Sequence, residues 1–186
     1  MPDKRDLLLA ALRRYKTNDV SEKNFIRETI TFIEENPNCF ERTNVAGHVT
    51  GSAWVLNPDG EKALLTHHKK LNRWLQLGGH SDGDPDTWHV ALREATEESG
   101  IQNCCFVTKD IFDIDIHEIP ENPQKGEPAH THYDVRFLLK APTENFIVSA
   151  ESNRLKWVTV QELDAMGKAI SPAMRRMINK WQHLKR

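Results

Sequence analysis

Residues 78–101 read GGHSDGDPDTWHVALREATEESGI, and this stretch decides how the rest of the chain is interpreted. Its pattern predicts a helix over about residues 86–99. Asp84 is suited to the N-cap, and Pro85 to the first helical position, where its missing N–H costs no hydrogen bond. Gly100, followed by an apolar residue, suits a left-handed stop at the other end. The sequence therefore predicts a helix with a defined start and a defined end.

Three glutamates of this helix share one face. Glu94 lies three residues before Glu97 and four before Glu98, so the carboxylates project from neighbouring positions. Like charges this close destabilise an isolated helix by about 0.2–0.5 kcal/mol per pair. A divalent cation reverses that effect, because Mg²⁺ and Mn²⁺ prefer oxygen ligands. From the glutamates alone, a metal site and a solvated acidic face are both open.

The glycine pair before the helix favours the metal site. Gly78 and Gly79 let the backbone approach a ligand closely or adopt a positive φ. Either conformation places bare carbonyl groups beside the acidic face. Carbonyl and carboxylate oxygens together predict a small cation site.

The same residues resemble the Nudix box, the signature of the Nudix hydrolases, G-x5-E-x7-R-E-U-x-E-E-x-G-U with U aliphatic. The fixed positions that match at the required spacing are Gly79, Arg93, Glu94, Glu97, Glu98, Gly100 and Ile101. Ala95 stands as a smaller substitute at the first aliphatic position. Pro85 stands where the family has its first Glu, which chiefly supports the loop and helix, and Leu77 replaces the usual Pro before the glycines.

The resemblance extends over about residues 47–165. Residues 74–77 are similar to the family's strand leading into the glycines. Trp-Val at 157–158 and Glu-Leu at 162–163 resemble its closing element. Some Nudix enzymes place an additional metal-binding or basic Glu in the loop before that element, and the matching candidate is Glu151.

The resemblance implies a divalent-metal-dependent pyrophosphohydrolase that splits a P–O–P link in a nucleoside diphosphate derivative. The implied ligands of Mg²⁺ or Mn²⁺ are the three helix glutamates and the carbonyl oxygen of Gly78. Such a metal would neutralise developing charge and lower the pKa of an attacking water. Arg93 would orient a helix carboxylate through a salt bridge. Because the general base differs among family members, the implied catalytic set is Arg93, Glu94, Glu97, Glu98 and Glu151.

The other elements are predicted from periodicity and turn residues. Helical stripes occupy residues 4–15 and about 21–36, and a later helix opens at Ser171-Pro172. Strands are predicted at residues 49–57, 62–67, 112–116, 130–139 and 154–158. The expected fold class is α/β (α+β), a Nudix-type α/β/α sandwich with a mixed sheet in residues 45–186. Residues 1–44 are expected to form an N-terminal helical extension.

A row of polar side chains is predicted on one strand. His130, His132, Asp134 and Arg136 alternate along the strand and so share one face. Such a face contacts phosphate or metal, or is the hydrated outer face of an edge strand. His80 directly follows the glycine pair, which places it near the implied metal. The candidate substrate-binding residues are His80, His132, Arg136 and Trp74, the last lining a nucleobase pocket or belonging to the core. His48 and the remaining histidines are assigned no role.

Composition excludes several classes of protein. The 186 residues carry 25 Lys and Arg against 27 Asp and Glu, so no overall field attracts a nucleic-acid polymer or an acidic membrane surface. The apolar run at residues 7–12 is too short for a signal core or a membrane span, so a cytoplasmic protein is expected. The three cysteines lack the spacing of a disulfide framework or a zinc site. The expected partner is a small-molecule diphosphate, and the N-terminal helices are a homodimer contact or a lid.

Two other functions stay open. An enzyme like isopentenyl-diphosphate isomerase shares the fold and can add histidine-coordinated metal. It would want a catalytic cysteine beside the diphosphate, whereas Cys104 and Cys105 follow the box helix. A non-catalytic nucleotide-binding module with a degenerate box is the other alternative, suggested by Pro85. The retained helix glutamates favour hydrolysis, and the sequence does not identify the substrate.

Overall fold

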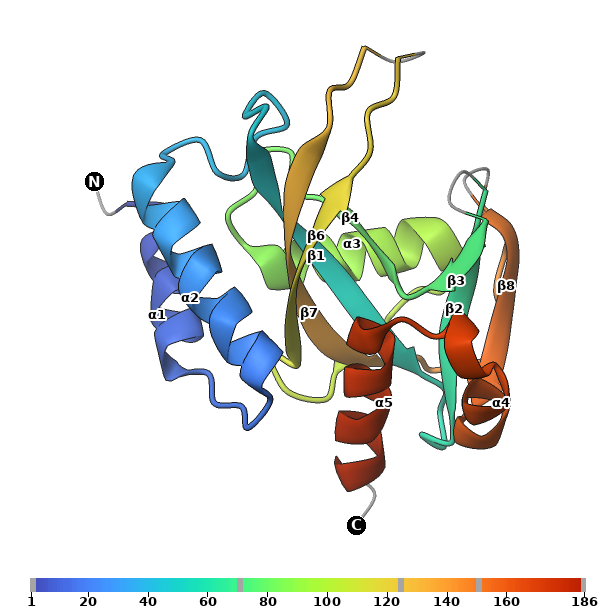
Figure 1. The fold of residues 1–186 in the computed structure, drawn as a ribbon. Helices are drawn as coiled ribbons and strands as arrows, with labels where there is room; N and C mark the ends of the chain where they lie inside the picture. The colour runs from blue at the N-terminus through green and yellow to red at the C-terminus, as the bar shows by residue number, and fades with distance from the viewer. Residues whose placement is uncertain (1–2, 70–71, 124–125, 150–151, 185–186) are drawn as a thin grey trace.

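A computed structural model of the chain describes residues 3–69, 72–123, 126–149 and 152–184 (Figure 1). The first half contains α1 (Asp6–Arg14), α2 (Val20–Glu35), β1 (Gly47–Leu56), β2 (Lys62–His68), β3 (Arg73–Leu75), β4 (Leu77–His80) and α3 (Thr87–Ser99). The second half contains β5 (Cys105–Phe106), β6 (Asp113–Ile119), β7 (His130–Lys140), β8 (Ser152–Thr159), α4 (Val160–Ala165), a short 3₁₀ helix (Gly167–Ala169) and α5 (Pro172–Leu184).

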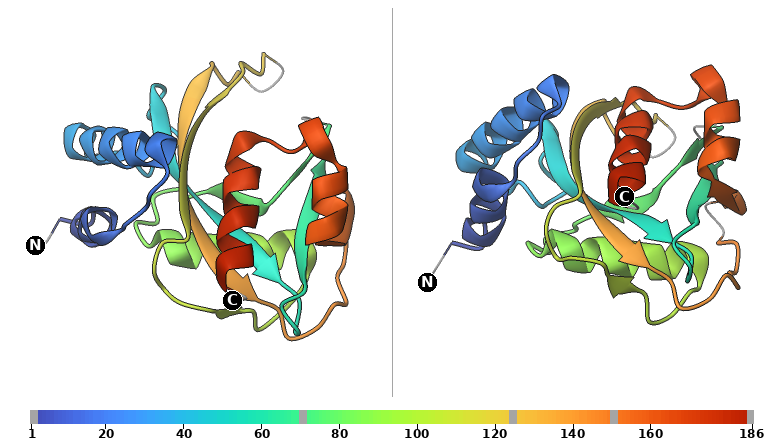
Figure 2. Two further views of the ribbon diagram at one scale, coloured as in Figure 1. Left: turned by 60° about the horizontal axis from the view of Figure 1, so that its bottom comes forward. Right: turned by 90° about the horizontal axis from the view of Figure 1, so that it is seen from below.

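Within the described residues, eight strands form one mixed sheet. Its main path is β3-β2-β1-β7-β5, with β4 paired to β1, β6 to β7 and β8 to β2. The central pair β1–β7 is parallel, and the other pairs are antiparallel. Figure 2 shows α3 on one side of the curled sheet and α4 and α5 on the other. This arrangement confirms the predicted α+β sandwich with helices before it.

Apolar side chains fill the space on both faces of the sheet. One cluster lies among β1, β7, α3 and the first two helices, and it includes Leu12, Ile33, Val49, Ala95 and Val135. The other cluster lies beneath α4 and α5, and it includes Trp54, Leu65, Leu163, Met177 and Trp181. β1 is buried along its whole length because both of its faces are covered. The functional residues on β1 and its neighbours therefore stand on a rigid support.

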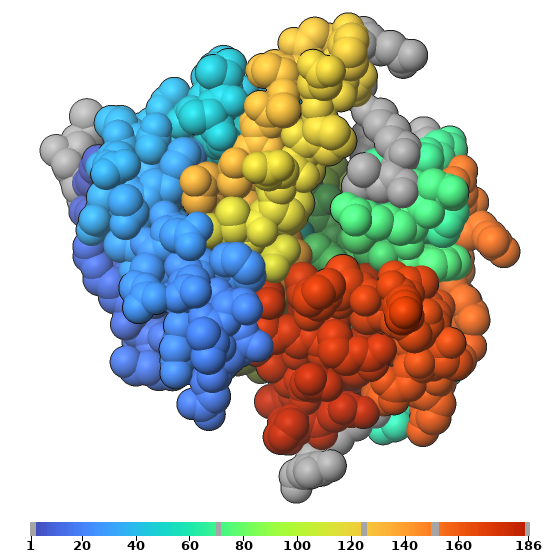
Figure 3. Space-filling view, viewed as in Figure 1, coloured from blue at the N-terminus to red at the C-terminus, as the bar shows by residue number. Residues whose placement is uncertain are grey.

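The first two helices pack against the same core as the sheet. Leu12 on α1 and Ile33 on α2 are fully buried, and the ring of Phe32 stacks on Tyr133 with centroids 3.9 Å apart. The hydroxyl of Tyr15, just after α1, donates to the carbonyl oxygen of Phe112 over 2.8 Å. The N-terminal helices, blue in Figure 3, thus lie on the outside of the molecule and pack one face each against the core of the described structure.

A buried ionic network joins β6, β7 and α5. Asp113 is fully buried, and its carboxylate accepts hydrogen bonds from Arg176, Lys180 and Arg136. Burial alone would raise the pKa of Asp113, but the hydrogen bonds from Arg176 and the neighbouring positive charges outweigh it and lower that pKa. Asp115 also accepts from Arg136 and Arg176. The network ties the last helix to the centre of the sheet.

The strand that the resemblance implies at residues 74–77 is divided between β3 and the start of β4. Two other short elements, β5 and α4, were not predicted. Both are too short for a clear periodicity, yet α4 carries a local signal. The Thr159 hydroxyl accepts from the N–H of Glu162, whose carboxylate accepts from the N–H of Thr159, which is a capping box. The predicted cap of α5 is confirmed, because the Ser171 hydroxyl accepts from the N–H of Met174. No helix among the described segments has both the length and the apolar character needed to cross a membrane.

Candidate active site

The ends of the acidic helix differ from each other in how well the sequence predicted them. Gly100 has φ of 69° and ψ of 0°, so the predicted left-handed stop is confirmed. The predicted range of about 86–99 agrees with the observed Thr87–Ser99, but the predicted cap is wrong, because the N-cap is Asp86 and both Asp84 and Pro85 precede the helix. Asp84 instead accepts the N–H of Asp86 over 2.9 Å and lies 2.7 Å from Nδ1 of His89. Its carboxylate therefore forms a turn just ahead of the helix.

Close packing of the glycine pair fixes the place of Glu94. β4 pairs with β1, so that Gly78 lies opposite Ser52. A Cβ atom on Gly79 would lie 2.4 Å from Oε2 of Glu94, and one on Gly78 would lie 2.2 Å from Oγ of Ser52. The Glu94 carboxylate thus lies directly against the backbone of Gly79, at a distance only glycine permits.

Arg93 links the helix to the end of β4. Its Nη2 donates to the carbonyl oxygen of His80 over 2.7 Å and lies 3.1 Å from Oε1 of Glu94. Its Nη1 lies 3.9 Å from Oε2 of Glu97. One guanidinium therefore contacts two carboxylates and a strand carbonyl, which are the contacts of a positioning group.

The three glutamates differ in their exposure. The side chain of Glu97 is 60% exposed, that of Glu94 is 15% exposed, and Glu98 is 9% exposed as a residue. They thus present carboxylate oxygens at graded depths along one face of α3. This donor set suits Mg²⁺ or Mn²⁺, both of which prefer oxygen ligands.

Contacts from the N-terminal segment hold the loop between β4 and α3. Arg42 forms an ion pair with Asp82, and the N–H of Gly83 donates to the carbonyl oxygen of Phe40 over 2.9 Å. Gly83 has φ of +89°, and a Cβ there would meet the Glu41 carboxylate. These contacts supply support for the loop in which Pro85 replaces a glutamate.

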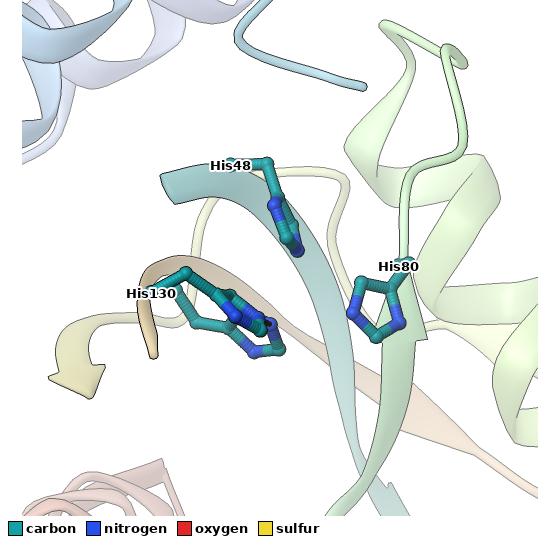
Figure 4. Close-up of side chains that lie close together, drawn as sticks. His48, His80 and His130 are labelled. Carbon is teal, nitrogen blue, oxygen red and sulfur yellow. Dashed lines mark hydrogen bonds between the residues drawn. The ribbon is translucent and has the colours of Figure 1, made fainter. Parts of the chain in front are cut away.

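Four histidines come together beside this loop. Their ring nitrogens, one from each residue, all lie within 4.8 Å of one another, and the residues are His48, His80, His130 and His132. Figure 4 shows His48 on β1, His80 on β4 and His130 on β7 with their rings turned toward a shared space. The register explains the meeting, because His48 is paired with His132 and Thr50 with His80. We call this group the histidine cluster.

Burial keeps members of the histidine cluster neutral at neutral pH. Burial lowers the pKa of His48 to about 4, with the charge of His130 adding to the effect. Burial also lowers the pKa of His80 to about 4, helped by Arg42 and His48. The pKa of His132 is lowered further, again chiefly by burial. Neutral imidazoles keep a lone pair available for a ligand.

His48 is the member that the sequence analysis missed. It is 3% exposed, and neither ring nitrogen has a hydrogen-bond partner within the described residues. Leaving such a buried polar group unpaired costs about 1–3 kcal/mol. The alternation of His48, Thr50 and Ser52 on one face of β1 was a usable signal, but the parallel pairing that brings His132 beside it is not visible in the sequence.

The other predicted site residues lie in different surroundings. Arg136 is 3% exposed and donates to Asp113, Asp115 and Asp134 inside the ionic network. Trp74 lies on β3, with its ring 5.1 Å from that of His67, and packs against the apolar cluster beneath α5. Neither is a member of the histidine cluster. Glu151 lies outside the described residues.

A family model for the NUDIX domain matches residues 47–180. The chain belongs to the NUDIX family. The match covers the glycine pair, the whole of α3 and most of α5. Arg93 and Glu94, whose contacts are described above, lie within the matched residues.

A curated relative and two solved structures are similar to this NUDIX chain. A "probable DHNTP pyrophosphohydrolase" of Lactococcus lactis subsp. cremoris (strain MG1363) is 31% identical over 94 residues, which are 50% of this chain and 53% of that protein. The chain thus spans about half the length of that relative. A C. elegans Ap4A hydrolase aligns with a TM-score of 0.54 and 19% identity, over 74% of this chain and 96% of that one. The E. coli dihydroneopterin triphosphate pyrophosphohydrolase aligns with a TM-score of 0.52 and 20% identity, over 71% of this chain and 92% of that one. At these identities the two structures support the NUDIX fold alone.

Proposed function

We propose that the chain is a divalent-metal-dependent pyrophosphohydrolase that splits the P–O–P link of a nucleoside diphosphate derivative. The observation that carries the proposal is the contact of the Glu94 carboxylate with the backbone of Gly79, which holds the acidic helix against the strand that carries the glycine pair. The L. lactis relative, described as a probable pyrophosphohydrolase, supports the same reaction class. A cytoplasmic location and a small-molecule substrate are part of the proposal.

Each residue of the site has a part in the proposed reaction. Glu94, Glu97, Glu98 and the carbonyl of Gly78 would hold Mg²⁺ or Mn²⁺. Such an ion, when bound, supplies charge neutralisation on the diphosphate and a water of lowered pKa. Arg93 holds Glu94 in place from one side while Gly79 holds it from the other. Glu97, the most exposed of the three, has the carboxylate most accessible to a substrate.

The cysteines do not favour the isomerase alternative. Cys104 is buried after α3, and burial raises the pKa of its thiol to about 11. A thiol with so high a pKa is almost entirely protonated at neutral pH, so it is a poor nucleophile and a poor acid. Cys105 is exposed and lies on β5, which pairs with the far end of β7 at Lys140. Neither thiol is a member of the histidine cluster, and the described hydrogen bonds of both go to backbone carbonyl groups and not to the glutamates of α3.

A substrate panel tests the proposal. The full chain is assayed with dinucleoside polyphosphates, nucleotide sugars, dinucleotide cofactors, nucleoside triphosphates and a pterin triphosphate, with phosphate and nucleotide release as the readout. We expect turnover of at least one class, its abolition by EDTA, and its return on addition of Mg²⁺ or Mn²⁺. Tight binding without turnover in both metals would support a binding module instead.

Substituting Gly79 tests the carrying observation. In Gly79→Ala the new Cβ displaces the Glu94 carboxylate, whose flexible end can move at little cost to folding. We expect kcat/KM for the best substrate of the panel to fall about 10²-fold, as for other misplacements near 1 Å, while the melting temperature changes little. Gly167→Ala is the control for losing a glycine away from the site: a Cβ there meets nothing within 4 Å, but the φ of +54° strains an alanine, so we expect a lower melting temperature with wild-type activity. Equal activity in the two variants would mean that this contact does not matter for the reaction.

A further inference from the structure

We propose that the histidine cluster is a second metal site, which binds a first-row transition dication such as Zn²⁺ through imidazole nitrogens of His48, His80, His130 and His132. The site is chemically distinct from the three glutamates of α3. It goes beyond the proposed hydrolytic activity and does not depend on it. The chain would then carry two classes of cation at neighbouring positions.

The cluster is assembled by the centre of the sheet and not by a mobile surface. His48 comes from β1, His80 from the end of β4, and His130 and His132 from the start of β7. β1 is hydrogen-bonded to both of the other strands. The ring of His48 lies at the middle of the histidine cluster, and its centroid is 4.8–5.0 Å from the centroids of the other three rings. A ligand shell built on paired strands is held in place before any ion arrives.

Buried His48 points independently to a ligand. It is 3% exposed, and both of its ring nitrogens are buried without a hydrogen-bond partner among the described residues. Buried polar atoms in folded proteins are nearly always paired, so each exception needs an explanation. A cation among the four rings gives one of these nitrogens a partner.

The orientation of His130 suits a metal ligand. Nδ1 of His130 lies 2.8 Å from the carbonyl oxygen of Pro128, which can only accept, so Nδ1 carries the proton and donates it. The lone pair is then on Nε2, which lies inside the cluster, 3.1 Å from Nε2 of His132. Metal-binding histidines commonly have their second nitrogen fixed in this way by a carbonyl or carboxylate.

The donor set decides which ions fit. Four imidazole nitrogens suit Zn²⁺, Cu²⁺, Ni²⁺ or Co²⁺ and do not suit Mg²⁺, which prefers oxygen. A tetrahedral Zn²⁺ with bonds of about 2.0–2.1 Å holds its ligand nitrogens about 3.3 Å apart. The nitrogens of the histidine cluster lie within 4.8 Å of one another, so binding draws the rings together by a small movement.

The test measures bound metal and not activity. The purified full chain is incubated with Zn²⁺ or Co²⁺ in excess Mg²⁺ and dialysed, and metal per chain is then measured by mass spectrometry. We expect one transition ion per chain and, with Co²⁺, the visible ligand-field bands of a low-symmetry nitrogen site. His48→Gln and His132→Gln should each weaken Zn²⁺ binding by more than about tenfold.

Control variants separate the two proposed sites. His183→Gln removes an exposed histidine of α5 and should keep the metal, as should Glu97→Gln with Glu98→Gln, which alters only the carboxylate site. His130→Gln, at the partly exposed start of β7, replaces His48→Gln as the test if that variant fails to fold by circular dichroism. Less than a stoichiometric ion in the wild type, or equal Zn²⁺ affinity in the wild type and the cluster variants, would overturn the proposal. So would loss of Zn²⁺ from the glutamate double variant.

Discussion

Changing Glu97 and Glu98 together to glutamine is expected to lower the turnover of a diphosphate substrate by on the order of a thousandfold. The amides keep the size of the side chains but lose two negative charges and much of their affinity for Mg²⁺ or Mn²⁺. Glu97 is exposed, and Glu98 lies deeper on the same face of α3. The measurement is kcat and KM for the best substrate of the panel, together with Mn²⁺ affinity by calorimetry.

The matched control for this pair is Glu35→Gln. Glu35 is exposed at the end of α2, so this change removes a surface charge at a distance from the acidic face. We expect wild-type kinetics for the control and an unchanged melting temperature for all of these variants. A double variant that keeps the wild-type rate would show that the reaction does not use the carboxylates of α3.

Asp113→Ala is expected to destabilise the chain by about 3–5 kcal/mol, because it removes the buried carboxylate that Arg136, Arg176 and Lys180 share. Arg136 and Arg176 are 3% and 8% exposed, and Lys180 also reaches the Asp113 carboxylate. For a chain of this size the loss corresponds to a fall in melting temperature of about 6–20 °C. Urea unfolding and thermal melting of the two proteins measure it directly.

Asp110→Ala serves as the control for that substitution. Asp110 is exposed just before β6, and its described side-chain partner is the hydroxyl of Thr108. We expect a change of less than about 0.5 kcal/mol there. If Asp113→Ala is as stable as the control, the network would be worth no more to the fold than a surface contact.

The acidic helix was predictable because its signals are local. Apolar positions at helical spacing, three spaced glutamates and a terminal glycine all lie within residues 86–100, and the left-handed Gly100 agrees with that prediction. The N-cap was predicted wrongly for an equally local reason. Both Asp84 and Asp86 can cap a helix, and the Asp84 carboxylate is taken by a turn and by His89. A local sequence pattern does not show which of two neighbouring aspartates caps the helix.

The contacts that were not predicted join residues that lie far apart in the sequence. Arg136 looked like a phosphate ligand on a polar strand face, but Asp113 on β6 and Arg176 on α5 surround that face with charges of both signs. His48 looked like an ordinary histidine until β1 paired in parallel with β7. Strand order and register determine both outcomes, and neither is encoded by periodicity.

The loop before α3 illustrates a compensation that crosses element boundaries. Pro85 removes a carboxylate that supports this loop in the family the box resembles. In this chain Arg42 and Phe40, which precede β1, hold Asp82 and Gly83 instead. A departure from a motif was visible in the sequence, whereas its replacement by a distant segment was visible only in the structure.

The packing of the first two helices has a consequence for how this protein can be dissected. The NUDIX match begins at residue 47, yet Phe32 covers Tyr133, and Glu22 accepts a hydrogen bond from Lys180 on the last helix. Helices α2 and α5 therefore contact each other directly, beside the start of β6. Cutting the chain at the family boundary would expose apolar surface of the core and leave Lys180 with Asp113 as its remaining described carboxylate partner. We therefore expect folding and melting to occur as one cooperative transition that includes α1, α2 and α5.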